Sequence, residues 1–392
     1  MWRAIFQVVP VLAWVLSLVV VVRPLRLSRG LAAAAAAALG VAFAKFTFFG
    51  VVGHDSFTPN LPQRFIWAYG WIYGTAMLLT AASFATWLFD GVADALRRPV
   101  SLRAKRVRCA ALAVLAAATA LWGIYEGVRV PAVRRVELAC PGLPASFDGY
   151  RIVHLSDLHC STAALRPRFE SIVAAVNALK PDLVAITGDF VDGTVASRRD
   201  DLAPLAGLVA KDGVFGCTGN HEAYWEWGRW YAALRDMGIV FPEKTGAVAI
   251  RRGGDALVVG ALADPAIRTR LMGLSEWEFA TNAFAGAPDG AFRILLFHRP
   301  VTDAVESAAA DVRLQLSGHT HGGAMPLLRT LVELQNEGRS GGLYEFAPGR
   351  SLYLSRGTGQ WAGFPIRLFV PAEITEIVLR SADRVSPRRA VP

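Results

Sequence analysis

Hydrophobic residues are distributed in two different ways along the chain, and the change falls near residue 130. Up to Val128 they form long runs, whereas from Val136 onward they form short runs that alternate with polar turns and amphipathic stretches. The first part has the pattern of a membrane region and the second that of a globular domain. We therefore expect a transmembrane region at 1–130, a globular domain at 136–380 and a tail at 381–392.

Four apolar stretches in the first part are long enough to cross a hydrocarbon core, which takes roughly 20 apolar residues as helix. They cover about residues 4–22, 31–53, 66–89 and 108–128. The second stretch contains an alanine run and one internal lysine, Lys45, so a soluble helical hairpin is its alternative. A cleaved signal peptide is a weaker interpretation of the first stretch, because it ends at Arg23-Pro24 and three more stretches follow. The pattern predicts an all-α region of four transmembrane helices.

The formal net charge of +9 does not lead us to expect nucleic acid as a partner, because many basic residues lie in short loops beside the apolar stretches. The loop near 23–29 and the loop near 97–106 are rich in Arg and Lys, while the loop at 54–64 has only Arg64. By the positive-inside rule the first and third loops are cytoplasmic, and the globular domain is extracytoplasmic. Three arginines just after the fourth stretch, at 129, 134 and 135, argue for the opposite orientation.

Five short apolar runs in the second part each end in a cluster of polar residues. The clusters are Asp157-Leu-His159, Gly188-Asp189-Phe-Val-Asp192, Gly219-Asn220-His221-Glu222, His298, and Gly318-His319-Thr-His321. Strands that alternate with helical stretches, such as 166–179, predict a layered α/β fold in which ligands gather beyond the carboxyl ends of the strands. We therefore expect the five clusters to converge at one edge.

Five of the seven histidines lie in these clusters, which scattered core histidines would not do. Imidazole, carboxylate and amide oxygen form a ligand set suited to Zn, Fe or Mn, and a shared carboxylate can hold two ions about 3.5–4 Å apart. A hydroxide held between two such cations can attack phosphorus while the cations neutralise the phosphoryl oxygens. Each motif alone is a weak signal, but their order, each after a strand, predicts two-metal hydrolysis.

The motif series resembles that of the calcineurin-like metallophosphoesterases, which is D-x-H, G-D-x-x-D, G-N-H-[DE], H and G-H-x-H. The resemblance covers roughly residues 148–380. It is closest to the bacterial membrane-associated branch, because G-H-T-H-G-G is followed by Leu352-Tyr-Leu-Ser-Arg-Gly357-Thr-Gly359 and then by Pro365-Ile-Arg367. One departure is Ala324, where that branch often has Gln. The resemblance implies a four-layer αββα sandwich with a dinuclear site.

Matched residue by residue, the resemblance implies seven metal ligands. They are Asp157, His159 and His321 for one ion, Asn220, His298 and His319 for the other, and Asp189 for both. His221 would face the substrate and protonate the leaving oxygen or stabilise phosphoryl charge, and Asp192 would orient it. A structural role beside a ligand is the alternative for His221, and Glu222 is interpreted as a helix-start acid.

The expected function is hydrolysis of phosphate esters or phosphoanhydrides by a membrane-anchored enzyme that uses two divalent ions (Mn, Fe or Zn). The membrane tether makes a lipid-linked or envelope substrate a candidate, on analogy alone. A membrane sensor or scaffold that binds a phosphorylated ligand without turnover is the alternative from another class. A transporter is a second rival, although Lys45 is the only clear intramembrane charge.

Overall fold

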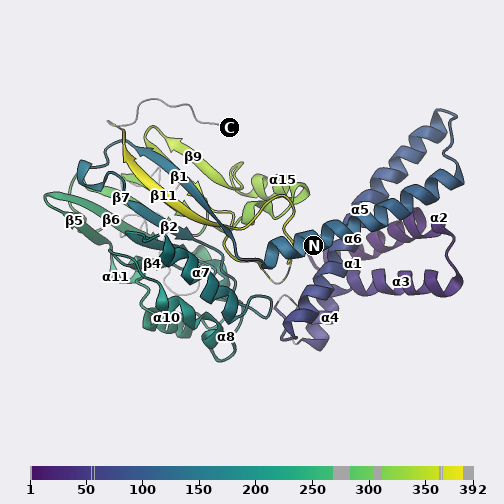
Figure 1. The fold of residues 1–392 in the computed structure, drawn as a ribbon, viewed down its shortest axis with the longest axis horizontal. Coiled ribbons are helices and arrows are strands. Elements are labelled where there is room, and N and C mark those ends of the chain that lie inside the picture. The colour runs from purple at the N-terminus through teal and green to yellow at the C-terminus, as the bar shows by residue number, and fades with distance from the viewer. Residues whose placement is uncertain are drawn as a thin grey trace. The chain divides into compact units, whose positions relative to one another are not determined.

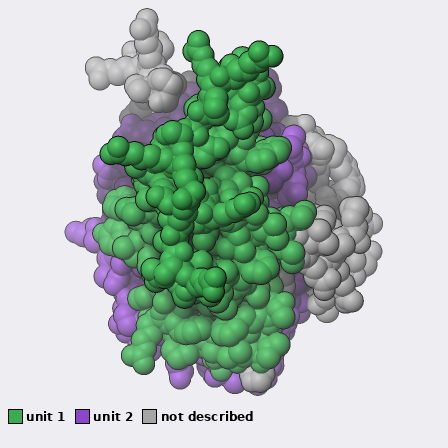
Figure 2. All heavy atoms as spheres, turned by 90° about the vertical axis from the view of Figure 1, so that its right-hand side faces the viewer, with its two compact units in different colours: residues 1–127, 362–368 green, residues 128–361, 369–392 purple. Residues whose placement is uncertain are grey.

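The computed structural model (Figure 1) describes residues 2–53, 55–56, 58–267, 283–302, 311–361, 363 and 365–382. The chain divides into two compact units, which are coloured separately in Figure 2. One unit comprises residues 1–127 and 362–368, and the other comprises residues 128–361 and 369–392. The inclusion of 362–368 in the first unit was not foreseen from the sequence. The predicted tail lies outside the described residues from 383 onward.

The first unit is helical. Its elements are α1 (Trp2–Ser17), a π-helical segment η1 (Leu18–Val22), α2 (Arg23–Leu25), α3 (Arg29–Phe43), α4 (Lys45–Val52), α5 (Gln63–Ala95) and α6 (Leu102–Val128). Only α5 and α6 are, within the described residues, single helices long and apolar enough to cross a membrane. The pair α3 and α4 qualifies together but is bent by 72°, and residues 9–25 form a shorter apolar helix. The described chain thus offers two candidate spans, or up to three, where hydropathy predicted four.

Lys45 is fully buried in the helical unit, although it is a charged residue within an apolar stretch. Its ammonium donates a hydrogen bond to the carbonyl of Gly363, and it lies 4.9 Å from the centroid of the Tyr73 ring. Buried charges in apolar surroundings need such partners, and aromatic ring faces attract cations. The lysine therefore helps to hold the segment 363–368 against the helices of its own unit.

Helix glycines make room for the same segment. A Cβ atom at Gly74 would lie 1.9 Å from Cδ1 of Ile366, and one at Gly123 would lie 2.8 Å from side-chain atoms of both Ile366 and Leu368. The backbone N–H of Arg367 donates to the carbonyl of Gly123 over 3.0 Å. Because close packing of this kind tolerates no added methyl group without rearrangement, the segment is an integral part of the helical unit.

The second unit contains two sheets, which confirms the predicted α/β class. The five-stranded sheet has the order β1 (Ala132–Cys140), β11 (Glu373–Ser381), β2 (Arg151–Leu155), β3 (Leu183–Thr187), β4 (Val214–Cys217). The six-stranded sheet has the order β5 (Val248–Arg252), β6 (Asp255–Leu262), β7 (Phe292–Phe297), β8 (Val312–Ser317), β10 (Arg350–Leu354), β9 (Gly342–Ala347). Strands β2, β3 and β4 are parallel, as are β6, β7, β8 and β10.

The main core lies between the two sheets. It joins residues of the first sheet, such as Ile152 and Leu183, to residues of the second, such as Leu257 and Ile294. A second apolar cluster covers the other face of β2 and β3, and it includes Phe169. Strands that are buried on both faces read as continuous apolar runs instead of alternating ones, which explains the sequence pattern.

Helices and turns complete this unit around the sheets. The predicted crossover helix between β2 and β3 is confirmed as α7 (Arg166–Ala178). The remaining described elements are η2 (Ala145–Phe147), α8 (Val195–Leu202), η3 (Ala203–Gly207), α9 (Asn220–Tyr224), α10 (Trp227–Asp236), α11 (Pro242–Thr245), η4 (His321–Gly323) and α15 (Pro326–Gln335).

Candidate metal centre

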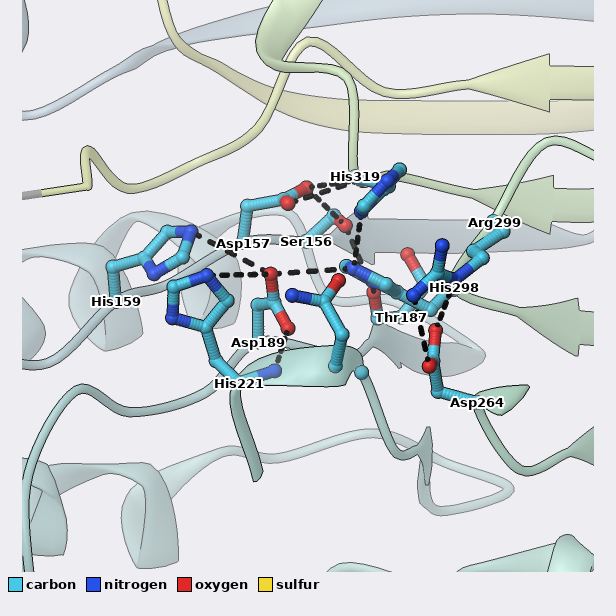
Figure 3. A network of polar contacts seen from close by, with 12 residues as sticks. Ser156, Asp157, His159, Thr187, Asp189, His221, Asp264, His298, Arg299 and His319 are labelled. Atoms are coloured by element: carbon cyan, nitrogen blue, oxygen red, sulfur yellow. Dashed lines mark hydrogen bonds and ion pairs between the residues drawn. The ribbon is translucent and has the colours of Figure 1, made fainter. Parts of the chain in front are cut away.

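The five predicted polar clusters converge in the structure (Figure 3). Each follows directly after a strand of the parallel parts of the two sheets, namely β2, β3, β4, β7 and β8. Carboxyl ends of neighbouring parallel strands meet at one edge of a sheet. The two sheets therefore deliver residues separated by more than 160 positions, such as Asp157 and His319, to one place, where the backbone N–H of His319 donates to Asp157.

The first group of candidate ligands contains Asp157, His159 and His321, whose ligand atoms all lie within 4.8 Å of one another. The two Nε2 atoms of His159 and His321 are 3.0 Å apart, and Nε2 of His321 is 3.4 Å from Oδ1 of Asp157. Nδ1 of His159 lies 3.0 Å from Oδ2 of Asp192. Because this contact occupies Nδ1, Nε2 is the nitrogen that faces the group, as in histidines that bind metal.

The second group contains Asp189, His298 and His319, again within 4.8 Å. Nε2 of His298 lies 3.2 Å from Oδ2 of Asp189 and 3.2 Å from Nδ1 of His319. Nδ1 of His298 is 2.8 Å from the carbonyl of Thr187, which can only accept, so Nδ1 carries a proton and Nε2 is the nitrogen that faces the group. Beside them Asn220 is buried, and its Oδ1 has no hydrogen-bond partner among the described residues.

Asp189 lies in the middle of the cluster. Its Oδ2 is 3.7 Å from Nε2 of His159 and 3.2 Å from Nε2 of His298, so one carboxylate adjoins both groups. The same oxygen is 3.9 Å from Nε2 of His221, and His159, Asp189 and His221 form a third group within 4.8 Å. By distance alone His221 could therefore act as a ligand as well. Its other nitrogen, Nδ1, contacts Asp192.

The backbone of the candidate ligands is unusual. Five of them have a left-handed conformation, with φ between 45° and 76°: Asp157, His159, Asp189, His319 and His321. Residues other than glycine seldom adopt this region, and each instance costs on the order of 1–3 kcal/mol. Such strain concentrates at functional sites, where the surrounding structure imposes it. The five outliers therefore mark this cluster as a functional site independently of its side chains.

The glycines of two motifs allow the carboxylates to pack against the backbone. A Cβ atom at Gly219 would lie 2.2 Å from Oδ1 of Asp189. One at Gly318 would lie 2.4 Å from Oδ2 of Asp157 and 1.7 Å from Oγ of Ser156. Neither position has room for a side chain, so the glycines of G-N-H and G-H-T-H are steric requirements. The sequence identified these motifs but not this reason for them.

Glu222 has a wider role than that of a helix-start acid. Its buried carboxylate accepts hydrogen bonds from three backbone N–H groups, those of Asp189 at 3.0 Å, Phe190 at 2.7 Å and Gly219 at 2.7 Å. It thus joins the turn after β3 to the turn after β4. Ser156 supports the first group in a similar way, because its Oγ donates to Oδ2 of Asp157 over 2.6 Å. Neither contact could be read from spacing in the sequence.

Asp264 and Arg299 form an ion pair beside the cluster, and sequence reasoning missed it (Figure 3). Asp264 is fully buried and accepts from Nε of Arg299 at 2.7 Å and from its Nη2 at 3.2 Å. A sixth apolar run, Leu257–Leu262, ends just before Asp264. This pattern matches the other five, but the run leads to no histidine, which is why it did not stand out.

The charges of the cluster point to cations. Burial lowers the pKa of His298, but the neighbouring carboxylate of Asp189 raises it, and the result is about 10. Burial and the nearby His298 lower the pKa of His319 to about 3. Burial opposes ionisation of Asp189, yet the surrounding imidazoles hold its pKa well below the usual value. Buried carboxylates that draw positive charge onto adjacent imidazoles, together with an unpaired amide oxygen, fit divalent metal ions.

The domain is a mixed α/β fold with Asp, Asn and His gathered at the carboxyl ends of its strands. This combination is typical of α/β proteins that bind metal ions. Residues 150–323 match the model of the calcineurin-like phosphoesterase family. The chain therefore contains a calcineurin-like phosphoesterase domain and is similar to known metallophosphoesterases, which confirms the superfamily that its motif series predicted.

Known proteins similar to this chain come from animals and from bacteria. The chain is 33% identical over 274 residues to a transmembrane protein with metallophosphoesterase domain from Danio rerio, covering 69% of this chain and 62% of that protein. It is 30% identical over 262 residues to an uncharacterized metallophosphoesterase from Campylobacter jejuni, covering 66% of this chain and 65% of that protein. The chain thus spans less than two thirds of either relative.

Among solved structures, a putative 5'-nucleotidase from Staphylococcus aureus aligns with a TM-score of 0.38 and 14% identity, covering 54% of this chain and 49% of that one. This similarity is too weak to carry an argument. The superfamily therefore rests on the family model and on the sequence relatives.

Proposed function

We propose that this protein is a membrane-anchored metallophosphoesterase that hydrolyses phosphate esters or phosphoanhydrides with two divalent metal ions. The observation that carries the proposal is the position of Asp189, whose Oδ2 adjoins the histidines of both ligand groups. A carboxylate between two sets of imidazoles is the arrangement that a pair of bridged cations requires. Membership of the superfamily and the apolar helices α5 and α6 support the rest.

In this proposal Asp157, His159 and His321 hold one ion and Asn220, His298 and His319 hold the other, with Asp189 shared. The donor set of imidazole nitrogen, carboxylate and amide oxygen suits Mn, Fe or Zn. When bound, the ions supply an activated water molecule near neutral pH and neutralise charge on the phosphoryl oxygens. The unpaired Oδ1 of Asn220 supports the second site, since a buried amide oxygen otherwise has a hydrogen-bond partner.

His221 is proposed to act on the substrate as a general acid. Its Nδ1 contacts Asp192, so its Nε2 is the nitrogen directed toward Asp189 and the cluster. The side chain is 16% exposed, whereas that of His159 is 1% exposed, so His221 is open to an arriving ligand. Asp192 would fix the imidazole in one orientation and leave Nε2 to donate a proton to the leaving oxygen.

Finer features of the architecture also belong to this proposal. We infer a four-layer αββα sandwich for the phosphoesterase domain, four membrane crossings at the N-terminal region and an extracytoplasmic catalytic domain. The apolar helices α5 and α6 favour a substrate presented at a membrane, such as a lipid-linked phosphate. Four crossings are proposed from the four apolar stretches of the sequence, of which the described residues offer two single candidate spans, or up to three with the bent pair; the positive loop near 97–106 supports the orientation.

The test uses the full chain purified in detergent. Metal content is measured by elemental analysis, and hydrolysis is followed with p-nitrophenyl phosphate and bis(p-nitrophenyl) phosphate. We expect about two metal ions per chain and turnover that is lost on chelation and restored by Mn, Fe or Zn. Asp157→Asn, which alters a proposed ligand, should lose metal and turnover, and Asp236→Asn, which alters an exposed acid, is its control. Metal binding without turnover of any phosphate ester would favour the sensor or scaffold alternative instead.

A further inference from the structure

We propose that Arg299 binds a second phosphate of the substrate, so that the preferred substrate is a phosphoanhydride with two adjacent phosphates. The inference rests on the proposed function and narrows its substrate class. It is drawn from the contacts of the Arg299 guanidinium, from the burial of its partner and from its place next to the candidate ligand His298. No residue of this ion pair belongs to the motif series.

The guanidinium is fixed before any ligand arrives. Its Nε and Nη2 both donate to the carboxylate of Asp264, at 2.7 Å and 3.2 Å. Asp264 is fully buried, and its Oδ1 also accepts from the backbone N–H of Ala266 at 2.8 Å. A paired guanidinium held by a buried carboxylate keeps one orientation and loses little freedom on binding. Arg299 is therefore preorganised.

The opposite edge of the same guanidinium is free to bind. Asp264 uses the side that carries Nε and Nη2, which leaves Nη1 and one N–H of Nη2. Among the residues that the structure describes, Nη1 has no hydrogen-bond partner, and the Arg299 side chain is 31% exposed. Two parallel N–H groups on one edge match the oxygens of a phosphate or carboxylate. An anion can therefore reach this edge from solvent.

The position of Arg299 points to a phosphate other than the one cleaved. Arg299 follows His298 in the chain, but none of its hydrogen bonds or ion pairs within the described residues reaches a candidate metal ligand. Figure 3 shows the Arg299 side chain beside that of the candidate ligand His298. The phosphoryl group under attack would be neutralised by the metals. The Arg299 guanidinium, beside the second group of candidate ligands, would bind the next phosphate of the same substrate.

The experiment compares two anions as inhibitors of p-nitrophenyl phosphate hydrolysis by the full chain with metal in excess. Inorganic phosphate has one phosphorus centre, and methylenediphosphonate has two that are linked and not cleaved. Arg299→Gln should weaken inhibition by methylenediphosphonate about 10- to 100-fold, the usual effect of losing a charge-assisted pair. Inhibition by phosphate should weaken much less, so that the ratio of the two inhibition constants shifts by about tenfold or more.

Arg313→Gln is the matched control, because Arg313 also pairs with an aspartate and its side chain is 32% exposed. It should leave both inhibition constants unchanged. Arg299→Lys keeps the charge but not the two-pronged edge, so it should lie between wild type and Arg299→Gln. Equal weakening of both anions by Arg299→Gln, or no weakening of either, would overturn the inference.

A failure of the proposed function would look different. If the wild-type chain hydrolyses no ester, the two anions can still be compared by calorimetric binding to the metal-loaded protein. A preference for methylenediphosphonate that disappears in Arg299→Gln would then support the second phosphate site while the hydrolytic proposal falls. Binding of neither anion in that comparison would count against both.

Discussion

Oδ1 of Asp192 lies 2.5 Å from Nδ1 of His221, while Oδ2 of the same carboxylate lies 3.0 Å from Nδ1 of His159. One buried acid thus orients two imidazoles of different proposed function. Both present Nε2 toward Asp189, at 3.7 Å for His159 and 3.9 Å for His221. The difference between them is exposure, because the His159 side chain is 1% exposed and the His221 side chain 16%.

Replacement of His221 separates the roles of catalyst and ligand. We predict that His221→Ala keeps both metals and slows turnover by roughly the 10²–10⁴-fold typical of a lost general acid. An ester with a very good leaving group should be affected less, because its departing oxygen needs no proton. Elemental analysis and rates on two esters of different leaving-group pKa provide the measurement. Loss of one metal ion in this variant would instead make His221 a ligand, which its distance to Asp189 also permits.

Asp189 is the residue whose loss should affect both metal sites at once. Asp189→Asn replaces the shared carboxylate by an amide that cannot bridge two cations equally, so metal occupancy and hydrolysis should both collapse. The measurement is metal content and turnover under metal-limited conditions. Asp236→Asn, at an exposed position, should alter neither. Wild-type turnover of Asp189→Asn under those conditions would refute the dinuclear proposal.

The sequence alone predicted which residues gather at the site. The prediction needed only the position of each candidate ligand directly after an apolar run. Each candidate ligand follows an apolar run, and parallel strands bring such positions to one edge. The contacts that hold the site could not be predicted in this way, because they join distant positions whose pairing depends on the three-dimensional register. Glu222 reaches the turn at Asp189 from 33 residues away, and Lys45 reaches Gly363 from 318 residues away.

Hydropathy was less informative about the helices. It counts apolar residues along a stretch but does not detect a bend, so residues 31–53 read as one span. In the structure the stretch breaks at Ala44, where ψ is 11°, and Lys45 begins a new helix. Helices α5 and α6 are longer than predicted, because polar and charged residues beyond their apolar parts are also helical.

Glu243 gives the protein a pH-dependent stability that can be tested outside the metal cluster. Its Oε2 accepts from the N–H of Thr218 at 3.0 Å, while Oε1 is buried without a partner among the described residues. Burial raises the pKa of Glu243 to about 7, above the ordinary 4.5. Because the pKa of Glu243 is higher in the folded state than in the unfolded state, binding of its proton stabilises the folded protein. This contribution is complete below about pH 4.5 and is lost as the pH rises through about 7.

Glutamine imitates the protonated acid, so Glu243→Gln should remove that dependence. We expect the variant and wild type to unfold at similar temperatures at pH 5. At pH 8 the variant should be more stable by about 3 kcal/mol, the linkage value of such a shift. Thermal unfolding of the detergent-solubilised chain provides the measurement. Glu137→Gln, at an exposed position, is the control, and a parallel pH profile for Glu243→Gln and wild type would contradict the prediction.

Gly74 should be required for packing of the segment 363–368. Gly74→Val would place its Cβ 1.9 Å from Cδ1 of Ile366, which is itself buried, so overpacking should cost about 1–3 kcal/mol. Release of the segment would expose the fully buried Arg367 to trypsin in intact membranes or detergent. Gly91→Val lies on the same helix with nothing within 4 Å and should remain protected. Equal protection of Gly74→Val would show that the segment does not depend on this contact.

The last prediction is that the catalytic domain lies outside the cytoplasm. It depends on the connection between α5 and α6, because these two helices are the single spans that length and composition support within the described chain. If both cross, residues 60 and 140 lie on one side and residues 96–101 on the other, whatever α1 to α4 do. The connection and the start of α6 carry five basic residues, at 97, 98, 103, 105 and 106, against Arg64 alone near the start of α5.

Short loops rich in Lys and Arg resist translocation, so the connection between α5 and α6 should stay in the cytoplasm. Alkaline phosphatase fused after residue 60 or after residue 140 should then be active, and the same reporter fused after residue 98 should be inactive. The fusion after residue 98 is the control, because it tests whether a fusion protein that is expressed but not exported leaves the reporter inactive. Arg129, Arg134 and Arg135 oppose this orientation, but they precede a large domain, and such domains are exported largely regardless of charge. Activity after residue 98 together with inactivity after residue 140 would reverse the orientation and make cytoplasmic phosphates the substrates to test.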